Sequence, residues 1–140
     1  MPKSVEYLGQ AAFRYCRNLT EIKFHGHRLG ELNGYVFEGC EALKKVELPI
    51  GMHSIMSYAF NKAGLEFLVL PSSIKKIYNY AFNETNLKRI DCHATNPPQI
   101  GEVFTTANYD NIELHVPNGS QQKYQTAPGW ANFVHIIPDL

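Results

Sequence analysis

The sequence has few of the features that mark nucleic-acid-binding or membrane proteins. Its formal net charge is zero, with thirteen Lys and Arg against thirteen Asp and Glu. It therefore lacks the basic excess that phosphate-binding and membrane-surface proteins need. No apolar run approaches the roughly 20 residues of a membrane-spanning helix. The three cysteines have no Cys-x-x-Cys spacing, which argues against a zinc motif.

Catalytic motifs are also missing. The sequence contains no Gly-x-Ser-x-Gly, no His-Glu-x-x-His and no Gly-rich phosphate loop. His25 and His27 look like a metal pair, but no third ligand is identified, and we interpret them as polar residues of a turn. We therefore expect no enzymatic activity, no bound metal and no cofactor.

What the sequence does contain is an internal repeat. Five phenylalanines recur at spacings of 24, 23, 22 and 22 residues, and the residue before each is Ala or Val. Each of the first four is followed by a Leu-x-x-Ile-x-Leu type of run, which predicts a short strand. The five positions are Phe13, Phe37, Phe60, Phe82 and Phe104.

A unit of 22 to 24 residues cannot bury its own apolar face, so the units must stack as a solenoid. We predict four repeats over residues 1–92, followed by a degenerate fifth repeat and a cap over residues 93–140. The segment before each Phe should return the chain as a short extended piece and then a turn or a single-turn helix. We also expect the Phe rings to form an internal ladder. Five parallel strands should bury Ile22, Val46, Leu68, Ile90 and Leu114.

The repeat resembles the BspA-like subfamily of leucine-rich repeat proteins. Residues 74–90 are the best single copy, and residues 114–120 and 129–133 resemble the closing segment of such proteins in gut and oral Bacteroidetes. The resemblance implies a β-rich leucine-rich repeat solenoid with a parallel sheet on its concave face. It also implies a secreted or cell-surface bacterial protein that acts in adhesion or recognition and has no catalytic residue. Residues 1–10 contain no apolar stretch typical of a signal peptide.

The two ends of the chain give different expectations. Ser120 should cap a helix over residues 121–126, a last strand should follow at 133–137, and Trp130 should cover the core. Residue 1 aligns with the boundary between two repeats, so we expect the C-terminal part of a longer array; a naturally short protein is the alternative. In either case we expect weak self-association through an exposed edge of Val5, Leu8 and Phe13.

Two columns of aligned residues have both a structural and a functional interpretation. Cys16 and Cys40 occupy the same repeat position, near disulfide range, and we favour stacked free thiols over a bond. Cys92 is expected in the core. Two residues before three of the phenylalanines lies a tyrosine. This column is either a stacking ladder, which we favour, or a strip that holds a sugar or peptide; its members are Tyr35, Tyr58 and Tyr80.

The outward residues of the strands form the candidate ligand-binding site. Neighbouring charges in this set have opposite sign, which predicts cross-strand ion pairs, and two apolar residues lie at its centre. The apolar pair favours a module that recognises a protein or glycan, and the paired charges favour a structural spacer. Phe67 is either a recognition anchor or a contact with neighbouring side-chain stems. The site comprises Lys45, Glu47, Phe67, Val69, Arg89 and Asp91.

Overall fold

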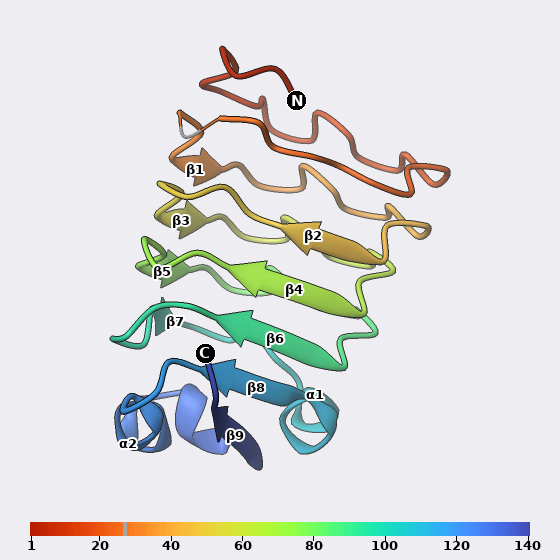
Figure 1. The fold of residues 1–140 in the computed structure, drawn as a ribbon. Coiled ribbons are helices and arrows are strands. Elements are labelled where there is room, and N and C mark those ends of the chain that lie inside the picture. The colour runs from red at the N-terminus through yellow and green to blue at the C-terminus, as the bar shows by residue number, and fades with distance from the viewer. Residues whose placement is uncertain (27) are drawn as a thin grey trace.

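The computed structural model describes residues 1–26 and 28–140, and it shows a stack of similar units (Figure 1). The central units each contribute one strand to each of two parallel sheets. The five-stranded sheet, in front in Figure 1, consists of β2 (Lys45–Glu47), β4 (Phe67–Leu70), β6 (Arg89–Cys92), β8 (Glu113–Val116) and β9 (His135–Pro138). The four-stranded sheet consists of β1 (Glu31–Leu32), β3 (Ser54–Ile55), β5 (Lys76–Ile77) and β7 (Gln99–Ile100).

The predicted strands of the front sheet are confirmed for four of the five units. Val46, Leu68, Ile90 and Leu114 are paired in parallel register, and none of them is more than 1% exposed. These side chains point inward because alternate residues of a strand face opposite sides of a sheet.

The prediction for Ile22 was wrong. Ile22 is only half-buried and lies outside any strand. Residues 20–25 form no backbone hydrogen bond with β2 among the described residues. The first unit is joined to the second through its turn instead, where the amide of Phe13 donates to the carbonyl of Val36 at 2.9 Å. The first unit thus has the apolar pattern of the other strands, but the backbone of residues 20–25 is not hydrogen-bonded to β2 and forms no strand there.

The predicted ladder of phenylalanine rings is confirmed. Successive rings lie 5.5, 5.3, 5.4 and 6.1 Å apart between centroids and are inclined by no more than 17°. Phe37, Phe60 and Phe82 are fully buried, whereas Phe13 is half-buried. Stacked rings contribute about 0.5–1.5 kcal/mol each beyond the burial of their area. The ladder therefore joins consecutive units through the core.

The return segments form the second sheet and then a turn. The expectation of a short extended piece is met by β1, β3, β5 and β7, each two residues long. Between β1 and β2, between β3 and β4 and between β5 and β6 the chain makes turns and no helix. Near the N-terminus, Leu8 is buried at 8% exposure, contrary to our expectation, because it packs against the core. Val5 and Phe13 are half-buried.

The C-terminal segment contains one helix that the sequence analysis found and one that it missed. The helix α2 (Gln121–Thr126) has the predicted bounds, but Ser120 makes no side-chain capping bond. The backbone of Ser120 is itself helical, with φ −95° and ψ −12°, whereas a capping residue is normally extended. The missed helix, α1 (Thr106–Asn111), begins with a capping box between Thr105 and Asn108.

A short 3-10 helix and a strand complete the covering of the core. Trp130, at the start of η1 (Trp130–Asn132), is fully buried as predicted, and its indole N–H donates to the carbonyl of Pro98 at 2.7 Å. The last strand, β9, begins at His135 rather than at residue 133, because Phe133 is buried beside Phe104 and Trp130.

Candidate functional site

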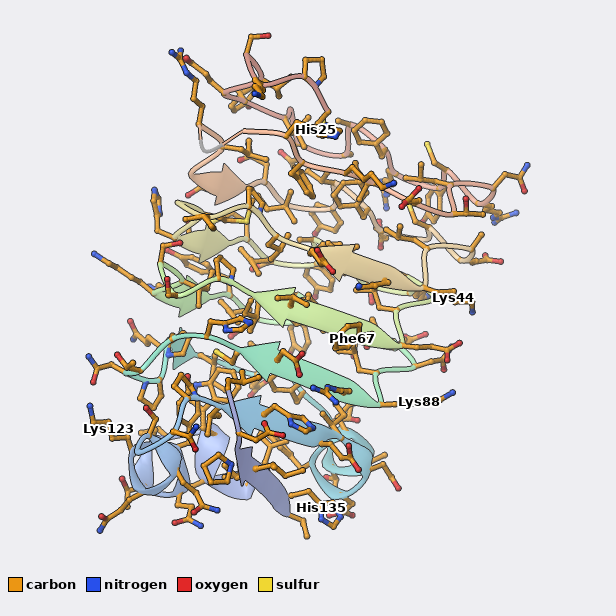
Figure 2. The ribbon with its side chains drawn as sticks, viewed as in Figure 1. His25, Lys44, Phe67, Lys88, Lys123 and His135 are labelled. Carbon is orange, nitrogen blue, oxygen red and sulfur yellow. The ribbon has the colours of Figure 1, made fainter. Side chains whose placement is uncertain are left out.

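The front sheet brings the six predicted site residues together on three adjacent strands. We call the solvent-facing side of this sheet the outer face. In register across β2, β4 and β6 lie Lys45, Phe67 and Arg89, and two residues further lie Glu47, Val69 and Asp91. Figure 2 shows Phe67 on β4, near the middle of this sheet.

The ion pairs of Lys45 and of Arg89 run along their own strands and not across the sheet, which corrects the sequence-based expectation. The Lys45 ammonium lies 2.5 Å from the Glu47 carboxylate. Arg89 donates to both carboxylate oxygens of Asp91, at 2.7 and 3.3 Å. Residues two apart lie on the same face of a strand. On β4 the neighbour of both cations is Phe67, which offers no charge. Arg89 also faces Glu113 on β8, yet its hydrogen bonds go to Asp91 on its own strand.

Cross-strand ion pairs occur one position earlier. Glu66 precedes β4 and lies 3.6 Å from the Lys44 ammonium and 2.8 Å from that of Lys88. Its hydrogen bond with Lys88, and then the charge of Lys88, hold the pKa of this carboxyl below its usual range. Figure 2 shows Lys44 and Lys88 at the edge of the front sheet, beside the starts of β2 and β6.

Phe67 lies between two cations. The Lys45 ammonium is 5.2 Å from its ring centroid and the Arg89 guanidinium is 5.6 Å from it, within the range of cation–π attraction. These contacts leave Phe67 half-buried rather than fully exposed, and Val69 is half-buried as well. The predicted contact with Lys45 and Arg89 is thus present, and an apolar pair still reaches the surface at the centre of the outer face.

The C-terminal part of the outer face is more enclosed. Asp91 is 9% exposed and His115, its neighbour on β8, is 5% exposed. His115 Nδ1 lies 2.7 Å from a carboxylate oxygen of Asp139. The hydrogen bond with Asp91 is the main cause that raises the pKa of Arg89. Sequence reasoning missed Asp139, because it lies after the last repeat and has no counterpart in the other units.

A hollow of about 560 Å³ adjoins this surface on the N-terminal side. It separates residues 20–25 from β2 and therefore occupies the place where the predicted first strand would have paired. Lys45 and Glu47 line it together with Ile22, Phe24 and His25, so it is continuous with the site on the outer face. The hollow could not be predicted from the sequence, because the repeat pattern predicted a strand in its place.

The comparison with known families agrees with this geometry. The model of the BspA type leucine-rich repeat region matches residues 1–116 in six copies. The chain belongs to this family. No curated protein matches the chain. Repeats of the BspA type typically form protein-interaction modules without enzymatic activity, and they typically occur on surface or secreted proteins.

The other candidate residues of this BspA-type array take structural positions. Cys16, Cys40 and Cys92 are free thiols; Cys16 is exposed, and the other two are buried. Burial is the main cause that raises the pKa of Cys40 and of Cys92 to about 11. A raised pKa keeps these thiols protonated and unreactive at neutral pH.

The remaining polar candidates do not gather into a metal site. The Nδ1–H of His25 donates to the carbonyl of Met1 at 3.0 Å, and His27 lies outside the described residues. Within residues 1–26 and 28–140, no three His, Cys, Asp or Glu side chains are grouped where they could hold a metal ion. In the same ranges, no helix is long and apolar enough to cross a membrane.

Proposed function

We propose that this chain is the recognition module of a secreted or cell-surface bacterial protein, and that its outer face binds a protein or glycan, as in adhesion to a host. The observation that carries the proposal is the half-exposed pair Phe67 and Val69, set in the middle of a sheet between two ion-paired couples. Binding free energy concentrates in a few central apolar anchors that a polar rim surrounds. The outer face has this arrangement.

The hollow beside β2 extends the proposed contact surface. Its volume of about 560 Å³ is within the range of small-ligand pockets, and it is lined by both apolar and charged residues, among them Ile22, Phe24 and Lys45. A partner that covers Phe67 could place a side chain or a sugar there. The ion pair of half-buried Arg89 with Asp91 would form the opposite rim of the contact.

The test compares two aromatic truncations. Phe67→Ala removes the proposed anchor, and Tyr7→Ala removes a ring that is 70% exposed and lies away from the outer face. We expect Phe67→Ala to abolish adherence to an arrayed panel of host proteins and glycans, whereas Tyr7→Ala retains it. Thermal unfolding of both variants should be close to that of the wild type. Retained adherence of a folded Phe67→Ala variant would contradict the proposed site.

The second candidate is a structural spacer. It is favoured by the ion pairs of Lys45 with Glu47 and of Arg89 with Asp91, which satisfy the charges of the outer face internally. On this hypothesis Phe67 holds the strands together through its two cation contacts. Phe67→Ala would then lower the unfolding temperature, and the wild type would bind nothing on the panel.

A further inference from the structure

The column of tyrosines leads to a second site, separate from the outer face. Tyr35, Tyr58 and Tyr80 lie in the turns that follow β1, β3 and β5. Their ring centroids are 5.1 Å apart at both steps, and Tyr35 and Tyr58 are inclined by only 3°. All three residues have φ near +60°, a backbone conformation that is uncommon outside glycine. The three turns thus repeat one unusual geometry that keeps the rings in contact.

Stacking leaves only the two ends of this column available to another group. Both faces of Tyr58 are occupied by its neighbours. At the N-terminal end the aligned residue is Ala11, which has no ring but has the same left-handed backbone, with φ 58°. The guanidinium of Arg14 fills the place of the missing ring, 5.3 Å from the centroid of Tyr35. Arg14 is held there by a 2.5 Å ion pair with Glu38.

At the C-terminal end the corresponding place is a hollow. The residue aligned with the tyrosines is Glu102, two before Phe104, and it also has no ring. Among the described residues no ring or cation covers Tyr80 on this side, and Tyr80 is tilted by 31° from Tyr58. A hollow of about 530 Å³ opens here, lined by Tyr80, Asn83, Glu102, Val103, Thr105, Thr106, Tyr109 and Asn132, among others.

Two side chains of this hollow, Asn83 and Glu102, offer hydrogen-bond acceptors beside Tyr80. A chain of bonds fixes one of them. Glu38 accepts from Arg14 and from the Asn61 amide at 2.8 Å, so Asn61 presents its oxygen to the Asn83 amide at 2.9 Å. Because a carboxylate can only accept, the directions along the chain are set, and the oxygen of Asn83 remains as an acceptor beside Tyr80.

Glu102 supplies the second acceptor and the charge. One of its carboxylate oxygens accepts the phenol hydrogen of Tyr80 at 2.8 Å, which is also the main cause of the raised pKa of Tyr80. Its other oxygen has no hydrogen-bond partner within residues 1–26 and 28–140. A ring face, a carboxylate and an amide oxygen therefore surround one hollow, as Tyr35 and Glu38 surround the guanidinium of Arg14.

We infer that the hollow beside Tyr80 binds an arginine side chain of a partner protein, with the guanidinium stacked on the Tyr80 ring and held by Glu102 and Asn83. A planar guanidinium both stacks on aromatic faces and donates to several acceptors at once, which an ammonium does less well. The negative charge of Glu102 disfavours anionic ligands. At the opposite end of the tyrosine column, Arg14 of this chain already makes this arrangement, with its guanidinium over Tyr35 and paired with Glu38.

The experiment titrates the full chain, carrying ¹³C-labelled tyrosine, with N-acetylarginine amide and follows the ring signals of Tyr80 by NMR. We expect saturable shifts of Tyr80 that weaken with added salt, and weaker binding of N-acetyllysine amide. Glu102→Gln keeps the shape of the side chain and should weaken arginine binding about tenfold, the loss typical of a charge-assisted hydrogen bond. The matched control is Glu41→Gln, at a carboxylate paired with Arg17 outside the hollow, which should bind as the wild type does.

Two results with the wild type would overturn the inference. One is the absence of saturable arginine binding, and the other is equal affinity for the lysine and arginine probes. Shifts of Tyr80 with methyl glucopyranoside but not with arginine would assign the hollow to a sugar instead. Phe67→Ala should leave arginine binding unchanged, so this site and the proposed function of the outer face can fail independently.

Discussion

The first unit and the C-terminal segment contact the Phe ladder in different ways. Within residues 1–26 and 28–30 there is no strand, and Phe13 stacks on Phe37 alone and stays half-buried. At the other end, Phe104 is met edge-on by Tyr109, Trp130 and Phe133, with ring centroids 5.1 to 6.0 Å away. The same ladder thus has one sparsely covered and one densely covered end.

The difference shows what the repeat pattern can and cannot specify. Each repeat presents a flat ring face to its neighbour, so adding another repeat always leaves a new ring face uncovered. The last ring is instead covered by rings that approach it at a different angle, and these belong to Tyr109, Trp130 and Phe133, which have no counterpart among the aligned phenylalanines. Terminal units of solenoids need such specialised sequences because an uncovered apolar face is poorly soluble.

Removing the centre of the C-terminal cover should have the largest effect. Trp130 is fully buried and its N–H satisfies the carbonyl of Pro98. We expect Trp130→Ala to lower the free energy of unfolding by about 3–5 kcal/mol, measured by urea denaturation. Trp130→Phe keeps much of the packing and should cost about 1–2 kcal/mol, mainly for the lost hydrogen bond. Equal losses for both variants would mean that the hydrogen bond, and not the packing, closes this end.

The next comparison is between the middle and the sparsely covered end of the ladder. Phe60 is fully buried between two rings, so Phe60→Ala should cost about 3–5 kcal/mol as a core deletion. Phe13→Ala should cost only about 1 kcal/mol, because its ring is already partly in water. Urea denaturation of the two variants measures the difference. If Phe60→Ala left stability unchanged, the ladder would not be internal.

The ladder, four strands of the front sheet and the bounds of α2 could be predicted from the sequence. They depend on side-chain periodicity and on local turn signals, which are visible in a single chain. The strand at Ile22 failed because pairing depends on where two backbones meet, and a periodic pattern does not contain that information.

Part of the candidate site followed from the same pattern, and part could not. The repeat placed Phe67 between Lys45 and Arg89, and the structure agrees. The pattern did not reveal that each cation pairs along its own strand, because pairing depends on side-chain reach. The chain of Arg14, Glu38, Asn61 and Asn83 also went unnoticed, since its residue types differ from unit to unit.

A pH titration compares a thiol of the sparsely covered end with one at the covered end. Burial raises the pKa of Cys92 to about 11 in the folded chain, above the ordinary value near 9. The folded state thus favours the protonated thiol, so this contribution to stability is complete below about pH 8.5 and is lost as the pH rises towards 11.

The measurement is the urea midpoint between pH 8 and pH 10.5. Cys92→Ala should flatten the decline of the midpoint at high pH, whereas Cys16→Ala, at an exposed thiol, should retain it. An identical decline in Cys92→Ala and in the wild type would show that other groups govern stability in this pH range.

The smallest expected effect is weak self-association through the first unit. In the first unit Tyr7 and Tyr15 are 70% and 51% exposed, and Val5 and Phe13 are half-buried. Apolar area removed from water stabilises a contact by roughly 25 cal/mol per Å². We expect the sedimentation coefficient to rise with protein concentration. Tyr7→Ser should suppress that rise, whereas Val134→Ser, which changes an exposed apolar residue of the covered end, should not. A constant sedimentation coefficient at all concentrations would show that the first unit, although sparsely covered, buries enough of its apolar surface to remain monomeric.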